Sequence, residues 1–252
     1  MIKNILNGIK TYGRTLGLIN TLKLWKYFAI PILISLLTAL VIGTTAYGLS
    51  DNLGTYISKV WIWDWGKEIF TSFSTFLGGI VILILGLILY KHIIMALSAP
   101  FMSPISEKIE AHLKGSPSHE HRITTFKAQL WRGIRINMRN LLKELLITIP
   151  IILIGFIPII GIVASVLVFL VQAYYAGFGN MDYTLERHFE YRESIAFVRK
   201  HRGIAMGNGI VFMLFLLIPI LGIILVLPLS VTAATIDTVT LLNQEETQHI
   251  KP

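Results

Sequence analysis

Cysteine is absent from this 252-residue chain, and charged residues are scarce. Without cysteine the protein can form no disulfide, can use no thiolate in catalysis and can hold no metal through sulfur. Charged residues account for 14% of the chain and hydrophobic residues for 54%, whereas an average soluble domain has about 25% charged residues. Together with the mean hydropathy of +0.68, this composition predicts an all-α integral membrane protein whose apolar surface meets lipid.

The signatures of common enzyme classes are missing as well. The chain lacks a nucleophile elbow, a His-Glu-x-x-His pair and a glycine loop that cradles phosphate. His112, His119 and His121 lie close together in the sequence, but no fourth ligand has a suitable spacing for a metal site. We therefore expect no catalytic residue, no metal and no cofactor, and we expect that the protein is not an enzyme.

Two nearly uninterrupted apolar segments, 28–49 and 69–97, are long enough to be transmembrane helices, because a span needs about 20 residues. The preceding segment 1–27 has apolar residues at helical spacing and no acid, which predicts an amphipathic helix on the membrane surface. Its cations are Lys3, Lys10, Arg14, Lys23 and Lys26. No linker separates a second unit, so residues 1–252 are expected to form a single membrane domain.

Two further apolar runs, 145–176 and 204–236, are each interrupted near the middle by a proline and a glycine. Each run is too long for one span and too short for two. We predict that each enters the membrane as a re-entrant helical hairpin, turns and leaves by the same face. The alternative is a pair of ordinary kinked spans, since proline is common in transmembrane helices. The residues predicted to break the hairpins are Pro158, Gly161, Pro219 and Gly222.

The distribution of charge predicts the orientation of the chain, because Lys and Arg gather in cytoplasmic segments. From Lys91 to Glu144 there are nine basic and four acidic residues, so this segment is expected to lie in the cytoplasm. It is expected to form amphipathic helices there. The stretch 177–202 is also basic, and re-entrant hairpins keep it on the same side together with both termini. Broken backbone inside a bilayer needs cover from protein or water. Such hairpins therefore imply an oligomer, a pore, or both.

A series of short motifs follows the chain from the second span towards its end. They are Ala99-Pro100-Phe101 with Glu107 and Glu110, Phe156-Ile157-Pro158, Asp182-Tyr183 with Glu186 and His188, Arg199-Lys200-His201-Arg202, and Ile218-Pro219 through Leu227-Pro228-Leu229 to Ala233-Ala234-Thr235. In this order they resemble the CysZ sulfate permease family and its etoposide-induced-protein-like relatives, over most of the chain. The resemblance implies two long transmembrane helices, two re-entrant hairpins, cytoplasmic termini, oligomeric assembly, and sulfate uptake across the bacterial inner membrane for cysteine synthesis.

The resemblance also implies an anion-binding site just before the first span, where that family carries a Gly-Leu-Arg turn. This chain has Lys23, Leu24, Trp25 and Lys26 there, so the glycine is missing while positive charge remains. A helix N-terminus with exposed N–H groups can still receive an anion, although Lys lacks the bidentate fork of Arg. The alternative role of these residues is to anchor the chain at the membrane interface.

A cationic stripe precedes the first hairpin. Arg132, Arg135 and Arg139 recur at helical spacing on one face of a predicted helix, opposite an apolar face. One interpretation is an amphipathic helix on anionic lipid. The other is an electropositive vestibule that concentrates dianions, in which Glu107 and Glu110 either pair with these arginines or form a solvated face.

Two segments near the hairpins have expected structural roles. The polar group that follows the first hairpin is expected to tie the cytoplasmic connection to the hairpin ends, and it consists of Asp182, Tyr183, Glu186 and His188. The alternatives are a role in proton coupling and, for Asp182, a helix cap. Gly207-Asn208-Gly209 is expected to loosen the start of the second hairpin.

These observations predict a passive permease or ion channel for sulfate or a similar small oxyanion, located in the bacterial inner membrane and feeding sulfur assimilation. The alternative is a membrane-embedded scaffold of the etoposide-induced-protein-like type that moves no solute. The expected partners are the oxyanion, membrane lipids and further copies of the chain. Nucleic-acid binding is not expected, because membrane topology accounts for the net charge of +8.

Overall fold

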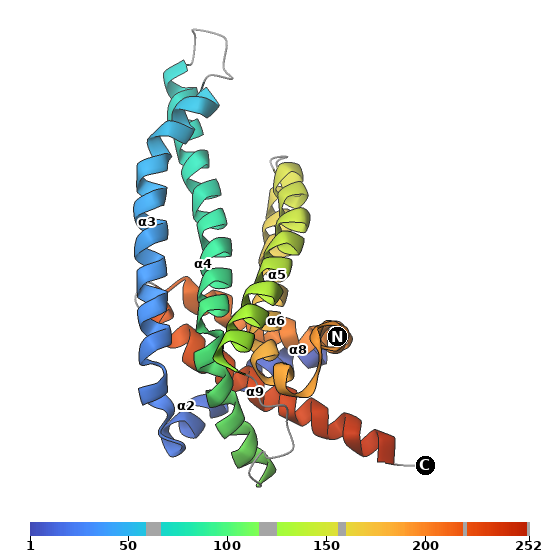
Figure 1. Cartoon of the computed structure of the whole chain (residues 1–252). Helices are drawn as coiled ribbons and strands as arrows, with labels where there is room; N and C mark the ends of the chain where they lie inside the picture. The colour runs from blue at the N-terminus through green and yellow to red at the C-terminus, as the bar shows by residue number, and fades with distance from the viewer. Residues whose placement is uncertain (59–66, 116–124, 156–159, 219–220, 251–252) are drawn as a thin grey trace.

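In the computed structural model, the described residues 1–58, 67–115, 125–155, 160–218 and 221–250 form helices and no strand (Figure 1). Four helices are long and apolar enough to cross a membrane, with candidate spans at 29–49, 85–114, 160–188 and 224–247. The predicted all-α membrane class is therefore confirmed. In chain order the elements are α1 (Ile2–Lys10), α2 (Tyr12–Thr21), the 3-10 helix η1 (Leu24–Tyr27), α3 (Ala29–Ser58), α4 (Lys67–Lys114), α5 (Phe126–Gly155), α6 (Ile160–His188), α7 (Tyr191–Lys200), α8 (Arg202–Leu216) and α9 (Leu221–Ile250).

The first two apolar segments form a tall antiparallel pair, α3 and α4 (Figure 1). Both helices extend beyond the predicted spans, and α4 continues through Pro100 and Pro104 as far as Lys114. Gly86 of α4 lies against Ile42 of α3, which brings the two helices close together. Most of the connection between these two helices, residues 59–66, lies outside the described residues.

Helices α5 and α6 lie side by side as a hairpin that runs along the α3–α4 pair, with its tip short of the far ends of α3 and α4 (Figure 1). The predicted cationic helix and the first arm of the hairpin are one continuous helix, α5. At the tip, a side chain on Gly161 would meet the carbonyl oxygen of Gly155, so this glycine allows the two helices to approach. Pro158 lies outside the described residues.

Helices α8 and α9 form the second hairpin, and α9 runs obliquely across the α3–α4 pair towards the C-terminus (Figure 1). Gly222 lies against the carbonyl oxygen of Phe215 and so permits the reversal between α8 and α9, while Pro219 lies outside the described residues. Helix α8 packs on α6 with no room for side chains, because a Cβ on Gly209 would overlap the carbonyl oxygen of Ala173. The segment Gly207-Asn208-Gly209 therefore does not loosen the start of the hairpin; it is a close-packed part of α8.

The N-terminal segment is not one helix. It is divided at Thr11 into α1 and α2, and a turn at Lys23 separates α2 from η1. Helix α1 packs on α8 through Gly8, whose Cβ position lies 2.7 Å from the carbonyl oxygen of Ile204. Apolar side chains of α1 remain exposed on the opposite side, among them Ile2 and Leu6.

Polarity on α5 is arranged in the reverse of a soluble protein. Its exposed side chains include Met138, Leu142 and Leu146, the last with 71% of its surface accessible. The buried positions are Gly133, Ile136, Asn137, Asn140, Glu144 and Thr148. This arrangement suits a helix surrounded by lipid. Apolar side chains can face lipid, whereas polar side chains find hydrogen-bond partners only inside the protein.

Candidate functional site

A line of buried polar residues follows the inner face of α5, where this helix faces α4 and α6. We call it the polar seam, and it consists of Asn137, Asn140, Glu144 and Thr148. These positions are spaced by three or four residues, so they share one side of the helix. The seam provides the hydrogen-bonding and charged groups that the outer face of the hairpin lacks.

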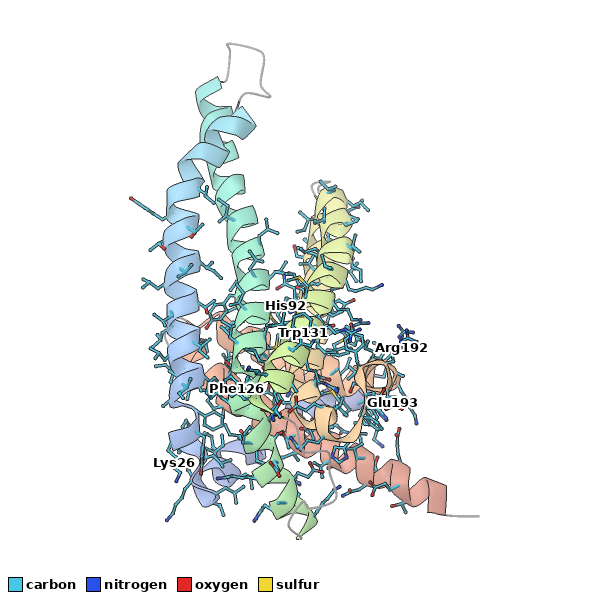
Figure 2. All side chains as sticks on the ribbon, in the orientation of Figure 1. Lys26, His92, Phe126, Trp131, Arg192 and Glu193 are labelled. Carbon is cyan, nitrogen blue, oxygen red and sulfur yellow. The ribbon has the colours of Figure 1, made fainter. Side chains whose placement is uncertain are left out.

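The centre of the polar seam is an ion pair with no access to solvent. The ammonium of Lys91 on α4 donates to Oε1 of Glu144 over 2.6 Å and to the carbonyl oxygen of Gln172 on α6 over 3.2 Å. His92 contacts the other carboxylate oxygen of Glu144 at 3.0 Å and Oδ1 of Asn137 at 3.3 Å. Lys91 and Glu144 are both 0% exposed. Figure 2 shows His92 among the helices, far from Lys26 at the lower end of the molecule.

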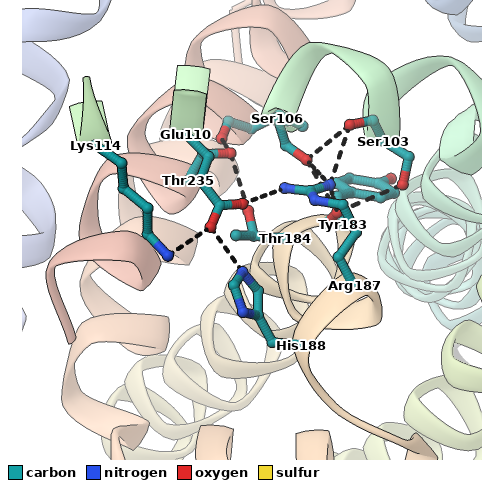
Figure 3. Close-up of polar contacts among 10 residues, drawn as sticks. Ser103, Ser106, Glu110, Lys114, Tyr183, Thr184, Arg187, His188 and Thr235 are labelled. Carbon is teal, nitrogen blue, oxygen red and sulfur yellow. Dashed lines mark hydrogen bonds and ion pairs between the residues drawn. The ribbon is translucent and has the colours of Figure 1, made fainter. Parts of the chain in front are cut away.

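A second buried ion cluster joins the lower part of α4 to the end of α6 (Figure 3). Arg187 donates to Oε2 of Glu110 over 2.9 Å, and His188 contacts Oε1 at 2.8 Å. Lys114 lies 3.2 Å from the same oxygen. Arg187 also donates to Ser106, which itself donates to the backbone of α6. Glu110 therefore fastens the last turn of α6 to α4 and is not part of a solvated face.

The cationic stripe of α5 is held against α6 and α7. Arg132 donates through Nε and Nη2 to the two carboxylate oxygens of Asp182 over 3.1 and 3.0 Å, and through Nη2 to Ser194 over 2.6 Å. Burial disfavours the charge of Arg132, but Asp182 outweighs this effect and raises the pKa of the guanidinium. Arg135 stacks on the ring of Tyr191 at 4.1 Å, and Arg139 lies 5.3 Å from the ring centre of Phe178.

A pocket of about 270 Å³ opens beside this stripe. Arg132 and Arg135 line it together with Glu186, whose Oε1 is buried without a hydrogen-bond partner among the described residues. The remaining lining residues are Ala128, Gln129, Trp131, Glu190 and Tyr191. The pocket thus combines two guanidinium groups with a buried carboxyl group at the junction of α5, α6 and α7.

The predicted anion-binding residues form a turn and a short 3-10 helix between α2 and α3. Lys23 has φ 51° and ψ 43°, and it is the one non-glycine residue with positive φ in the described chain. This left-handed conformation favours glycine, the residue that the resembling family places in its Gly-Leu-Arg turn. Leu24 is buried and anchors the turn, whereas Lys26 is exposed and Trp25 is 39% exposed, donating to Asn20.

A cation that the sequence did not associate with this turn comes from α4. Lys108 donates to the hydroxyl of Tyr27 and lies 4.0 Å from the centre of its ring, while Lys26 lies 5.1 Å from that centre. The hydrogen bond from Lys108 lowers the pKa of Tyr27. Positive charge from two helices therefore converges on Tyr27, next to the start of α3.

The predicted site residues do not form one group. Arg132 is paired with Asp182, and Glu110 with Arg187, His188 and Lys114, so these two residues belong to separate clusters. Glu107 is exposed on α4. The polar group after the first hairpin does link α6 to its neighbours, since Asp182 binds Arg132 and the Tyr183 hydroxyl donates to Met95 of α4. Within the described part of the chain, no group of three or more His, Asp or Glu residues is arranged to hold a metal; His119 and His121 lie outside it.

The chain is similar to known proteins along most of its length. Sulfate transporter CysZ of Pseudomonas aeruginosa (strain LESB58) is 27% identical over 238 residues, which cover 92% of this chain and 94% of the relative. The protein of the same name from Vibrio parahaemolyticus is 25% identical over 236 residues, covering 90% and 91%. That of Pectobacterium atrosepticum is 30% identical over 149 residues, covering 58% and 54%.

The model of a family described as Sulfate transporter CysZ/Etoposide-induced protein 2.4 matches residues 11–227. This match takes in α2 to α8 and the start of α9, and with them the two helix pairs and the polar seam. The description of the family is that of a transporter, which fits the expectation that the protein is not an enzyme. The chain belongs to the Sulfate transporter CysZ/Etoposide-induced protein 2.4 family.

Proposed function

We propose that this protein is a permease or channel of the bacterial inner membrane that lets sulfate or a similar small oxyanion move passively down its gradient and so feeds sulfur assimilation. The relatives named above are sulfate transporters, which supports the substrate. The observation that carries the proposal is the polar seam, a line of buried charged and amide groups inside helices whose outer faces are apolar.

The polar seam and its surroundings contain hydrogen-bonding atoms that are not used. Asn140 Nδ2, Thr148 Oγ1 and Ser98 Oγ are buried and have no partner among the described residues. Buried polar atoms in proteins are nearly always paired with protein or ordered water. These unpaired atoms lie near the ion pair of Lys91 and Glu144. We propose that water or an oxyanion passing along the polar seam supplies their missing hydrogen bonds.

Two groups of cations would deliver the anion to this path. The first is the turn of Lys23, Leu24, Trp25 and Lys26, and we include Lys108 with it because Lys108 lies against the neighbouring Tyr27. The second is the predicted vestibule of Arg132, Arg135 and Arg139 on α5. Of the two acids predicted beside it, Glu107 is exposed on α4, and Glu110 belongs to the separate cluster with Arg187 and His188. Cationic clefts raise the local concentration and the on-rate of anions. In support of passive movement, the runs 145–176 and 204–236 contain no charged residue; the titratable groups at the polar seam lie outside these runs, at Lys91, His92 and Glu144.

The proposed topology has α3 and α4 as full spans, two re-entrant hairpins and both termini in the cytoplasm, within a single domain of residues 1–252. Helix α8 has 15 residues and is about 22 Å long, short of the ~30 Å hydrocarbon core. Helix α9 is long enough to span but crosses the α3–α4 pair obliquely (Figure 1). Exposed leucine and isoleucine at the hairpins favour lipid or further copies of the chain as neighbours, and we propose a homo-oligomer.

This topology can be tested with single cysteines, since the chain has none of its own. Arg192→Cys, at an exposed position of α7, is expected to react with a membrane-impermeant thiol reagent only from the cytoplasmic side. Lys127→Cys at the start of α5 is the matched control for that side. Asn52→Cys lies between the predicted spans 28–49 and 69–97, on the opposite side in this topology, and is the control for that side. Labelling of Arg192→Cys from outside would make the first hairpin a complete crossing and refute the re-entrant arrangement.

Transport is tested by uptake of radiolabelled sulfate into liposomes that contain the purified protein. We expect uptake along a gradient, and we expect Lys23→Gly combined with Lys26→Gln to lower its initial rate about tenfold, because focusing charges change capture rates by roughly 10 to 10³. Glycine is chosen at position 23 because it removes the charge and keeps the left-handed turn.

Lys3→Gln combined with Lys127→Gln removes the same charge from two exposed positions outside the turn and should leave uptake unchanged. Equal rates for both double variants would show that the turn does not capture the anion. Absence of uptake for every oxyanion tested would favour the scaffold role.

A further inference from the structure

A polar groove lies beside the N-terminal helices α1 and α2, separate from the polar seam and from the pocket at Arg132. Its volume is about 580 Å³, within the range of small-molecule sites. Helices α1 and α2 form one wall, and α8 with the C-terminal half of α9 forms the other. Its charged and titratable lining residues are Lys10, Arg14, His201 and Asp237.

The acidic side of the groove is Asp237, which is only 9% exposed. One carboxylate oxygen, Oδ1, accepts a hydrogen bond of 2.6 Å from Thr11. The other, Oδ2, is buried and has no hydrogen-bond partner among the described residues. A buried carboxylate oxygen without a donor is unfavourable by itself. The groove therefore offers a strong acceptor site to a ligand that carries N–H or O–H groups.

The basic side of the groove is formed by Lys10 and Arg14, one helical turn apart at the junction of α1 and α2. Both side chains are exposed, and neither forms an ion pair with another described residue. The other acid near this groove, Glu245, is already bound to Lys200 and His201 at 2.6 and 3.0 Å. Two cations are thus available to an anionic group on the same ligand.

The charges of the groove select the class of ligand. A simple anion would be repelled by Asp237, and a simple cation would be repelled by Lys10 and Arg14. A molecule that joins a primary ammonium to a phosphate satisfies both sides, with the ammonium at Asp237 and the phosphate at the two cations. Asn4, Asn7 and Gln244 add neutral hydrogen-bonding groups at the rim, and Ile204, Ile236 and Leu241 make part of the wall apolar.

The position of the groove favours a lipid over a soluble molecule of the same chemistry. Its wall α1 exposes Met1, Ile2 and Leu6, and α2 exposes Leu16, so this part of the protein presents apolar side chains next to its cations. Such amphipathic helices lie in the membrane interface, where headgroups are found. We infer that this groove binds the headgroup of phosphatidylethanolamine, with its ammonium donating to Oδ2 of Asp237 and its phosphate held by Lys10 and Arg14.

The test uses native mass spectrometry of the full-length protein, delipidated and then mixed with phosphatidylethanolamine, phosphatidylcholine or phosphatidylglycerol of identical acyl chains. We expect the protein to retain phosphatidylethanolamine about tenfold better than phosphatidylcholine, because the quaternary ammonium of choline has no N–H to donate, and a hydrogen bond to a charged group accounts for roughly this factor. Asp237→Asn should abolish the preference, since the amide still accepts from Thr11 but places a donor where Oδ2 was.

Two further variants keep the test independent of the stability of Asp237→Asn. Lys10→Gln combined with Arg14→Gln should weaken retention of both zwitterionic lipids and leave their ratio unchanged, because both carry the phosphate. Lys3→Gln, on the same helix but outside the groove, should change neither. Equal retention of the ethanolamine and choline lipids by the unmodified protein would overturn the inference, as would stronger retention of phosphatidylglycerol. Displacement of the lipid by an equal concentration of soluble O-phosphoethanolamine would assign the groove to a soluble ligand instead.

Discussion

Replacement of Glu144 by alanine is expected to lower the free energy of unfolding by about 3 to 5 kcal/mol, the usual effect of removing one partner of a buried ion pair. Glu144 accepts the hydrogen bond of Lys91 at 2.6 Å and contacts His92 at 3.0 Å. Lys91 is 0% exposed, so its ammonium cannot reach solvent when the carboxylate is gone. Among the described residues it would keep only the carbonyl oxygen of Gln172 as a partner.

The measurement is equilibrium unfolding in detergent micelles, and a double-mutant cycle separates the pair from the packing around it. Lys91→Met and Glu144→Leu are each expected to destabilise the protein strongly. The double variant should be much closer to the unmodified protein, because apolar side chains of similar volume replace a buried ion pair with little loss. If the effects of the two single substitutions simply add, Lys91 and Glu144 do not stabilise each other and the argument fails.

The ion pair of Lys91 and Glu144 was not predicted from the sequence. The signal that could have indicated it is a third pattern on α5, beside the cationic and apolar faces. The contrast between the arginines and the large apolar residues marks two faces of this helix, and both were recognised. The polar seam is a third pattern, in which Asn137, Asn140, Glu144 and Thr148 follow one another at helical spacing. Its meaning depends on what covers the helix, because inward asparagine and glutamate are stable only when α4 and α6 supply Lys91, His92 and the backbone of Gln172.

The membrane class and the family were predictable because they depend on composition and on the order of motifs, and both are confirmed. The lengths of elements were harder to predict. The second span was predicted to end at residue 97, yet α4 continues to Lys114, and its polar side chains find partners on α5 and α6, as Lys91 does at Glu144 and Glu110 at Arg187. The partners of Glu110 were also hidden, since they lie about eighty positions away in the sequence, at Arg187 and His188. The proposed anion site and vestibule remain predictions.

A glycine can be favoured by the backbone conformation, as at the left-handed position 23, or required by close packing of helices, as in α8. At position 23 the backbone is left-handed, a conformation that favours glycine, and this chain adopts it with lysine. In α8 the two glycines around Asn208 looked like a flexible start of the hairpin, but they allow the backbone of α8 to contact the backbones of α1 and α6. Sequence alone does not distinguish these uses, because both require only that a side chain be absent.

Gly177→Ala and Gly209→Ala are each expected to destabilise the protein by at least about 1 to 3 kcal/mol, the usual effect of overpacking. A Cβ on Gly177 would overlap the carbonyl oxygen of Ala205, and one on Gly209 would overlap that of Ala173. Both obstacles are backbone atoms in helices, so no side chain can rotate away. The contact between α6 and α8 must open, and with it the hydrogen bond of 2.9 Å between Asn180 and Asn208.

The matched control is Gly43→Ala in α3, where nothing lies within 4 Å of the added Cβ. Alanine is favoured over glycine in a helix by about 1 kcal/mol, so this variant should be neutral or slightly more stable in the same unfolding measurement. The same chemical change is thus expected to have opposite signs at positions 43 and 177. A common sign at the two positions would mean that helix propensity governs both, and that α6 and α8 are not held at backbone contact. Opposite signs would show that close approach of these helices, and the buried amide pair that it allows, fixes the second hairpin beside the polar seam.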